Sequence, residues 1–251
     1  MEILPKNCTF AENFNFMTYK ENILTFAREH EMFSIADAQK NIAPDIPIEQ
    51  MTWYLNQMVK AKTLARVGTG TFTINTKFDF TDRLENIAVE IYDSLHATLP
   101  FARMCIYDSS YISPLQHHLA GNNIIYVEVE RNALESVFFM LKDAYKNVYL
   151  KPTKETIYQY VDNEVQSIFV KPLISEAPIK MVDSYPIPTI EKLLVDLYKD
   201  KDFYMYQGAE YDYIFENALT LYNVNTTKLL RYASRRGIKN EIQNQLKKYD
   251  K

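Results

Sequence analysis

Between residues 83 and 174, segments with helical spacing of apolar residues alternate with short runs rich in β-branched and aromatic residues. The β-prone runs cover residues 102–108, 123–130, 147–152 and 166–174. Strands that alternate with helices favour a mainly parallel or mixed sheet covered by helices. The alternation therefore predicts an α/β domain, and everything after Pro186 is predicted to be helical and to form a C-terminal bundle.

A separate module is predicted over residues 1–80. Three helical segments are expected, the first with a capping box at Thr18 and Glu21, the second with a similar start at Ser34 and Asp37. Two β-prone runs then flank Gly68-Thr69-Gly70, which predicts a hairpin. This order, and the stretch "LNQMVKAKTLARVGTGTFTI" in particular, resembles the winged helix-turn-helix family. The predicted fold is thus mixed α+β and α/β, with a winged helix in residues 1–80 and an α/β plus helical domain in residues 81–251.

A winged helix suggests DNA binding, because its third helix enters the major groove while basic groups hold phosphates. No acidic residue occurs from residue 50 to residue 78. The candidate DNA-binding residues are Gln50, Trp53, Gln57, Lys60, Lys62, Arg66, Thr69, Thr71 and Lys77. Winged helices also serve as protein-binding modules, and Glu49 would repel phosphates near the helix start, so an adaptor without DNA contact stays open.

The composition is that of a folded protein: 47% of the 251 residues are hydrophobic and 24% are charged. No run approaches the ~18 apolar residues of a membrane span. The start, "MEILPKNCTF", lacks the pattern of a signal peptide, so a cytoplasmic location is expected. Cys8 and Cys105 are too few for a disulfide framework or a metal quartet.

The formal net charge of −4 hides an uneven distribution. Residues 225–251 contain eight Lys or Arg and only two acids. Within them, "NTTKLLRYASRRG" predicts an amphipathic helix with Leu229, Leu230 and Ala233 on its apolar side. The basic face suggests contact with a negative partner or with the acidic remainder of the same chain.

Motifs for chemistry are scarce. Glu128 and Glu130 lie two apart in a predicted strand, the spacing of paired carboxylates that hold magnesium in nucleotidyltransferases. Such enzymes also need an upstream Gly-Ser turn, which is missing, so we favour glutamates at a solvated edge or face of the sheet. His117 and His118 are adjacent and cannot readily share one metal on a helix. We therefore expect no enzyme, no cofactor and no metal.

The helices "PTIEKLLVDL" and "LLRYASRRG" resemble the AbiEi-like antitoxins of type IV, abortive-infection toxin–antitoxin systems. The stretches "YISPLQHHLA" and "IIYVEVERNALESVFFMLK" are similar to little-characterised bacterial relatives of that family. The resemblance implies a winged helix that represses its own promoter and a second domain that neutralises a nucleotidyltransferase-like toxin. It also implies a partner surface composed of Glu191, Lys192, Asp196, Arg231, Tyr232, Arg235 and Arg236. Lys228, on the basic face of the same helix as Arg231, is a further candidate for this surface.

Three hypotheses follow from the sequence. The first is a DNA-binding autoregulator and antitoxin. The second is a nucleotidyltransferase-like enzyme that uses Glu128 and Glu130 with magnesium. The third is a protein-binding adaptor with a winged helix that does not bind DNA.

Overall fold

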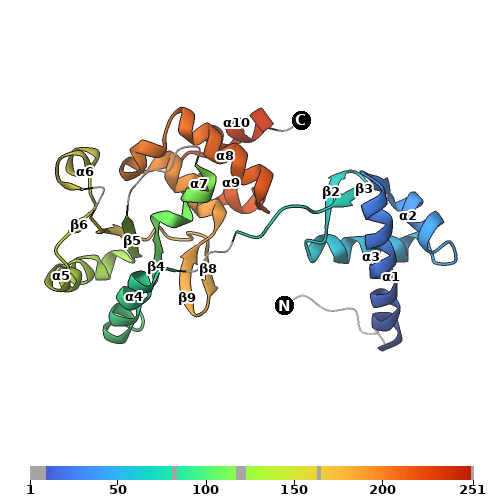
Figure 1. The fold of residues 1–251 in the computed structure, drawn as a ribbon, viewed down its shortest axis with the longest axis horizontal. Helices are drawn as coiled ribbons and strands as arrows, with labels where there is room; N and C mark the ends of the chain where they lie inside the picture. The colour runs from blue at the N-terminus through green and yellow to red at the C-terminus, as the bar shows by residue number, and fades with distance from the viewer. Residues whose placement is uncertain (1–9, 81–83, 117–122, 163–164, 250–251) are drawn as a thin grey trace. The chain divides into compact units, whose positions relative to one another are not determined.

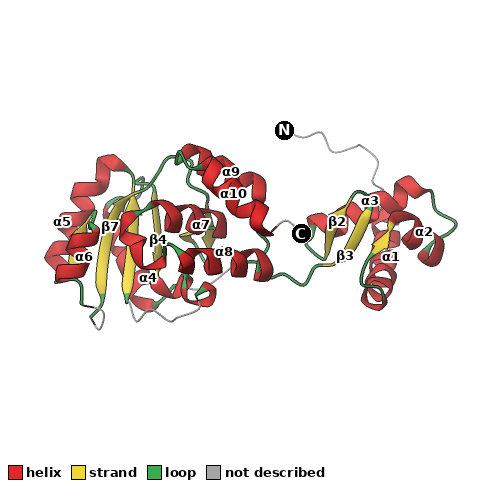
Figure 2. Cartoon of the chain, turned by 90° about the horizontal axis from the view of Figure 1, so that it is seen from above, coloured by secondary structure: helices red, strands yellow, loops and turns green. Residues whose placement is uncertain are grey.

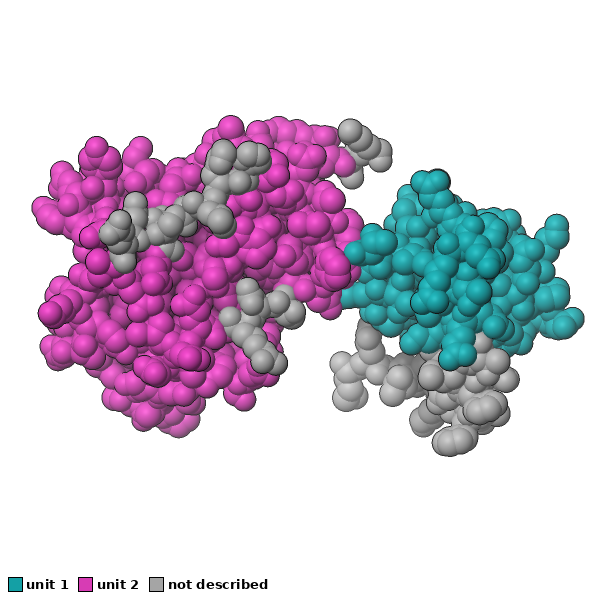
Figure 3. Space-filling model, in the orientation of Figure 1, with its two compact units in different colours: residues 1–76 teal, residues 77–251 magenta. Residues whose placement is uncertain are grey.

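The computed structural model describes residues 10–80, 84–116, 123–162 and 165–249 (Figure 1). The chain divides into two compact units, Met1–Thr76 and Lys77–Lys251, coloured separately in Figure 3. The predicted class is confirmed, because the chain is mixed α+β with a mixed sheet and C-terminal helices. Within the described ranges, no helix combines the length and the apolar character needed to cross a membrane.

Unit 1 contains three helices and a small antiparallel sheet. The helices are α1 (Phe10–Glu29), α2 (Ile35–Ile42) and α3 (Ile48–Lys60); the strands are β1 (Phe33–Ser34), β2 (Leu64–Gly68) and β3 (Thr71–Ile74). The strand order is β1-β3-β2. The predicted hairpin is confirmed as β2 and β3, and Gly70 takes a φ of 71° in its turn, a conformation that favours glycine.

The ends of the first two helices test the predicted caps. At α2, the Ser34 hydroxyl accepts from the backbone N–H of Asp37, and the Asp37 carboxylate accepts from the backbone N–H of Ser34. This confirms the predicted cap. The predicted capping box at Thr18 and Glu21 is wrong, because α1 already begins at Phe10 and Thr18 lies inside it. The residues before Thr18 continue the helix, so no free N–H groups remain there to be capped.

Helix α3 buries Met51, Leu55 and Met58, as its spacing predicts. Tyr54 is buried as well, and its ring lies 5.4 Å from that of Tyr19 on α1, centroid to centroid. The spacing of Ile48, Met51, Leu55 and Met58 predicts that all four lie on one buried face, but Ile48 is 44% exposed because it occupies the first helical position, at the end of the core. The buried face of α3 is therefore rotated slightly from the expected one.

Unit 2 is built on a four-stranded mixed sheet of order β4-β5-β7-β6 (Figure 2). The strands are β4 (Met104–Asp108), β5 (Ile124–Val129), β6 (Val148–Leu150) and β7 (Ser167–Pro172). β4 runs antiparallel to β5, whereas β5, β7 and β6 run parallel. In the parallel part, all carboxyl ends meet at one edge of the sheet.

Helices cover both faces of this sheet (Figure 1). On one face, α4 (Asn86–Thr98) and α5 (Leu134–Ala144) pack on Ile106, Val127 and Val170. On the other face, Tyr107, Tyr126 and Phe169 pack against the C-terminal helices. Side chains alternate along a strand, so Glu128 and Lys171 project from this second face.

The remaining elements complete unit 2. They are α6 (Lys154–Tyr160), α7 (Ile190–Lys199), α8 (Ala209–Leu221), α9 (Thr226–Arg235) and α10 (Lys239–Tyr249), the 3₁₀ turns η1 (Ser109–Tyr111), η2 (Ser113–Leu115), η3 (Arg131–Ala133) and η4 (Lys201–Tyr206), and a hairpin of β8 (Ile179–Val182) and β9 (Tyr185–Pro188). The stretch "SPLQHHLAG", residues 113–121, predicts a short helix closed by Gly121, and the structure has the 3₁₀ turn η2 at its start; His117, His118 and Gly121 lie outside the described residues.

The β8–β9 hairpin corrects the expectation that everything after Pro186 is helical. Asp183 and Ser184 form its turn with positive φ angles of 48° and 74°. Pro186 and Pro188 lie within β9, where proline is tolerated because the sheet has only two strands and both are edges. Because proline lacks a backbone N–H, the two prolines did not suggest a strand in the sequence. An edge strand tolerates them because few of its N–H groups need to donate.

Candidate functional site

The centre of unit 2 is helix α7, which is buried over eight consecutive residues, from Ile190 to Leu197. Its apolar side chains pack in the core, but Glu191, Lys192 and Asp196 are buried with them. A charge taken out of water is costly unless it is paired and hydrogen-bonded. The contacts of these three side chains therefore determine what the helix can do.

Lys192 connects α7 to the sheet. Its Nζ atom lies 2.6 Å from Oε1 of Glu128 on β5 and 2.7 Å from Oδ2 of Asp196, one helical turn away. The Tyr107 hydroxyl donates to the same Glu128 oxygen at 2.9 Å. Lys192 also lies 5.4 Å from the centroid of the Tyr107 ring, within cation–π distance. The ammonium group is thus compensated on several sides.

Asp196 connects α7 to α9. Its Oδ1 atom accepts from the Tyr232 hydroxyl at 2.9 Å and from Nη1 of Arg236 at 2.6 Å. The other end of the Arg236 guanidinium pairs with Asp200, just after α7. Glu191, nearer the start of α7, accepts from the backbone N–H of Asn225 at 2.9 Å. It therefore helps to anchor the start of α9.

Lys171 on β7 extends the chain of charges to η4. Its Nζ atom lies 3.1 Å from Asp200 and 2.7 Å from Asp202. We call the whole set the buried charge network: Tyr107, Glu128, Lys171, Lys192, Asp196, Asp200, Asp202, Tyr232 and Arg236. It links β4, β5, β7, α7, η4 and α9, which are far apart in the sequence.

The carboxylates of the network favour the protonated, charged forms of its two lysines. Burial by itself would lower the pKa of Lys192, but the carboxylates of Asp196 and Glu128 outweigh it and raise the pKa well above its usual value. Burial by itself would also lower the pKa of Lys171, but the carboxylates of Asp202 and Asp200 outweigh it and raise the pKa. Burial would raise the pKa of Asp200, yet Lys171 and Arg236 hold it below its usual value.

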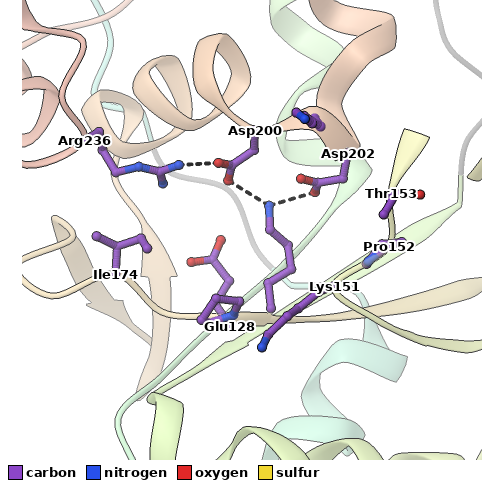
Figure 4. Close-up of a pocket in the computed structure, with 11 residues that line it drawn as sticks. Glu128, Lys151, Pro152, Thr153, Ile174, Asp200, Asp202 and Arg236 are labelled. Carbon is purple, nitrogen blue, oxygen red and sulfur yellow. Dashed lines mark hydrogen bonds and ion pairs between the residues drawn. The ribbon is translucent and has the colours of Figure 1, made fainter. Parts of the chain in front are cut away.

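A pocket of about 310 Å³ opens beside this network, at the edge where the parallel strands end (Figure 4). We call it the acidic pocket after Glu128, Asp200 and Asp202, although four basic side chains, Lys151, Lys171, Lys201 and Arg236, also line it. Its lining residues are Glu128, Lys151, Pro152, Thr153, Lys171, Pro172, Ile174, Asp200, Lys201, Asp202 and Arg236. In open α/β sheets, ligands bind at the carboxyl ends of the strands, where loops from successive strands meet. The acidic pocket has that position in unit 2.

A second pocket of about 670 Å³ shares Ile174 and Arg236 with the first. We call it the arginine pocket. Its lining residues are Arg103, Glu130, Arg131, Asn132, Leu173, Ile174, Ser175, Arg235 and Arg236. Arg103 reaches this edge because β4 is antiparallel and begins where β5 ends; its carbonyl accepts from the backbone N–H of Glu130 at 3.0 Å.

The two glutamates that suggested a magnesium site are separated in the structure. Glu128 is 2% exposed and paired with Lys192, so the expectation of a solvated edge or face is wrong for it. Glu130 lies beyond the end of β5 and lines the arginine pocket. Across the described residues, no group of three or more His, Cys, Asp or Glu side chains is arranged to hold a metal ion.

The candidate DNA-binding residues of unit 1 lie on α3 and the β2–β3 hairpin. Lys60, Lys62 and Arg66 are exposed, and Nη2 of Arg66 donates to Oδ1 of Asn56 on α3 at 2.6 Å. That contact joins the hairpin to the helix. Trp53 is 39% exposed on α3.

Three further DNA-binding candidates are half-buried in unit 1, and one belongs to the other unit. Gln50, Gln57 and Thr71 are half-buried, and Nε2 of Gln50 donates to the Tyr54 hydroxyl at 2.9 Å. Thr69 is exposed at the hairpin tip, and Lys77 belongs to unit 2.

The residues that the antitoxin resemblance singled out do not form one surface. Glu191, Lys192, Asp196 and Tyr232 are buried. Arg236 is half-buried, and Nζ of Lys228 lies 4.0 Å from Oε2 of Glu191. Arg231 and Arg235 are exposed; both Nε and Nη2 of Arg235 donate to the Ser175 hydroxyl. The basic face of α9 therefore faces partly outward and partly toward acids of the same chain.

Several residues of the site were missed from the sequence: Tyr107, Lys171, Asp200, Asp202, Arg103 and Arg131. Lys171 carried a usable signal, since a lysine inside the apolar run "SIFVKPL" must find a carboxylate if the strand is buried. The arginines carried none, because their convergence depends on the direction of β4 relative to β5.

Comparison with known proteins identifies only the family of this chain. A search of curated proteins finds no match to this chain. A model of a family of unknown function, DUF6577, matches residues 50–251, from within α3 to the last residue. Since the match covers most of the chain, including the whole of the described sheet and the charge network, this protein belongs to the DUF6577 family.

Proposed function

We propose that this protein is a cytoplasmic DNA-binding regulator whose unit 1 is a winged helix-turn-helix. The observation that carries the proposal is the cluster of exposed Lys60, Lys62 and Arg66 at the end of α3 and on the hairpin. It lies in a stretch without acids, residues 50–78, in a chain of net charge −4. Cations concentrated at a helix end and an adjoining hairpin suit a duplex whose phosphates flank the groove.

The local geometry supports this use of the helix. Trp53 is exposed on α3, and Gln57 lies one turn further along the helix. The contact between Arg66 and Asn56 holds the hairpin cation next to α3. A helix with amide side chains for base edges and flanking cations for phosphates has both components of sequence-specific binding.

Binding of the full chain to the DNA upstream of its own coding region tests the proposal. The association constant should fall steeply with salt concentration, and Lys60→Ala or Arg66→Ala should weaken binding and reduce the salt slope by about one. Arg28→Ala, which removes an exposed cation from α1 of the same unit, is the matched control and should bind as the wild type. Absence of salt-sensitive binding to that DNA would contradict the proposal.

We also propose that unit 2 acts as an antitoxin against a nucleotidyltransferase-like protein. The support is the resemblance carried by α7 and α9 to the AbiEi-like antitoxins. The two resembling helices are joined through Asp196, which contacts both Tyr232 and Arg236. The resembling residues thus form one connected core, and the contacts with a toxin would be made by the surface that this core supports.

Co-expression with a nucleotidyltransferase-like protein encoded beside this chain tests the second proposal. The wild type should restore growth, and the Lys60→Ala/Arg66→Ala variant should restore it equally from an independent promoter, because its changes lie in unit 1. Growth inhibition that persists in the presence of the soluble, folded wild type would contradict the antitoxin role without affecting the DNA-binding proposal.

A further inference from the structure

The arginine pocket gathers cations from three distant parts of the chain. Arg103 precedes β4, Arg131 follows β5, and Arg235 ends α9. In the part of the chain that the structure describes, none of the three forms an ion pair with a carboxylate. Glu130 is the single acid in the lining, so the pocket has a surplus of positive charge on an acidic protein.

Arg236, on the wall that both pockets share, differs from the other three. Its guanidinium is held by Asp196 and Asp200, so its charge is already compensated and its position is fixed. Like charges that converge on one cavity repel each other, and a fold gains nothing from that arrangement by itself. The guanidinium groups suit a ligand with several anionic oxygens, because arginine binds phosphate with two parallel hydrogen bonds.

We propose that the two adjoining pockets bind a nucleotide, with its phosphate chain in the arginine pocket and its nucleoside in the acidic pocket. The proposal concerns unit 2 only and is independent of DNA binding by unit 1. Arg103, Arg131 and Arg235 bind the phosphate oxygens. Asn132, at the same pocket, supplies a neutral amide donor.

The acidic pocket suits the remainder of such a ligand. Pro152, Pro172 and Ile174 provide apolar walls against which a planar base can pack. The side chain of Asp200 is 20% exposed, so its carboxylate can accept hydrogen bonds from sugar hydroxyls. The position at the carboxyl ends of β5, β6 and β7 brings these groups together within one cleft (Figure 4).

Isothermal titration of the full chain with ATP, tripolyphosphate and adenosine, in buffer without magnesium, tests the proposal. ATP should bind more tightly than either fragment, because it alone fills both pockets. Arg103→Gln and Arg131→Gln should each weaken ATP binding about tenfold or more, the loss expected for one charge-assisted hydrogen bond. Since neither side chain has an ion pair in the described structure, both variants should keep the wild-type melting temperature.

Arg231→Gln is the matched control. Arg231 is exposed on α9, one turn before Arg235, and does not line either pocket. This variant should bind ATP as the wild type, as should the Lys60→Ala/Arg66→Ala variant of unit 1. The proposal is overturned if ATP does not bind, if tripolyphosphate binds as tightly as ATP, or if the Arg103 and Arg131 variants match the Arg231 control.

Discussion

Lys192 on α7 and Glu128 on β5 form an ion pair with 2.6 Å between Nζ and Oε1, and both side chains are closed to solvent. A buried ion pair is weak evidence for stability, because desolvation offsets much of the attraction. Removal of one of the two side chains is strongly destabilising, because the remaining charge stays buried without its partner. In unit 2 this pair joins the central helix to the sheet, and Glu128 also lines the acidic pocket.

Replacement of Lys192 by methionine should therefore destabilise unit 2 by about 3–5 kcal/mol. The change keeps much of the side-chain volume but leaves Glu128 with the Tyr107 hydroxyl and Asp196 with Tyr232 and Arg236. Urea unfolding followed by circular dichroism measures the loss. Lys199→Met, at the exposed end of the same helix, is the control and should shift the transition by less than about 0.5 kcal/mol.

Fluorescence of the single tryptophan can show which unit loses stability. Trp53 lies in unit 1, so its fluorescence reports the unfolding of that unit. We expect the Lys192→Met transition to move in the circular dichroism signal and to stay in place in the fluorescence signal. A fluorescence transition that moves in parallel would mean that the two units unfold together.

The buried tyrosines give a pH prediction. Burial, together with the charge of Glu128, raises the pKa of Tyr107 well above its usual value; burial likewise raises the pKa of Tyr126 and Tyr211. The folded state therefore holds these protons more tightly than the unfolded state. The corresponding stability is fully present below the unfolded pKa of about 10 and is lost as the pH rises above that value toward the folded pKa.

Phenolate absorbance measures the titration. The buried Tyr107, Tyr126 and Tyr211 should ionise only together with a loss of circular dichroism, because their pKa values are raised in the folded state. The expectation fails if all 19 tyrosines titrate in one reversible step while the circular dichroism is unchanged.

The sequence predicts the elements of this fold better than their contacts. Local signals sufficed for the α2 cap, the β2–β3 hairpin and the four strands of the sheet in unit 2, because turn chemistry and side-chain period act over a few residues. Lys192 and Asp196 lie four residues apart, a spacing that predicts a pair on one helix, and the pair is present. Its burial against Glu128 could not be read from spacing, since 64 residues separate the lysine from the glutamate.

Urea unfolding also tests the capping box at α2. The hydroxyl of Ser34 and the carboxylate of Asp37 each accept from the other's backbone N–H. The pKa of Asp37 is lowered because its carboxylate accepts hydrogen bonds from the Ser34 hydroxyl and from the Ser34 backbone N–H. Ser34→Ala should destabilise unit 1 by about 1 kcal/mol, read from Trp53 fluorescence during urea unfolding. Ser136→Ala, on the exposed side of α5 in unit 2, should leave that transition unchanged. An unchanged midpoint for Ser34→Ala would show that the cap contributes nothing to unit 1.

The last prediction separates the two proposed ligands with one signal. Trp53 is the only tryptophan and is 39% exposed on α3, so its emission should change when duplex DNA covers that helix. ATP, bound in unit 2, should leave the emission unchanged. The Lys60→Ala/Arg66→Ala variant should require a higher DNA concentration for the same change, because it lacks two phosphate contacts. If labelled DNA binds while the Trp53 emission stays constant, the DNA contacts a surface other than α3.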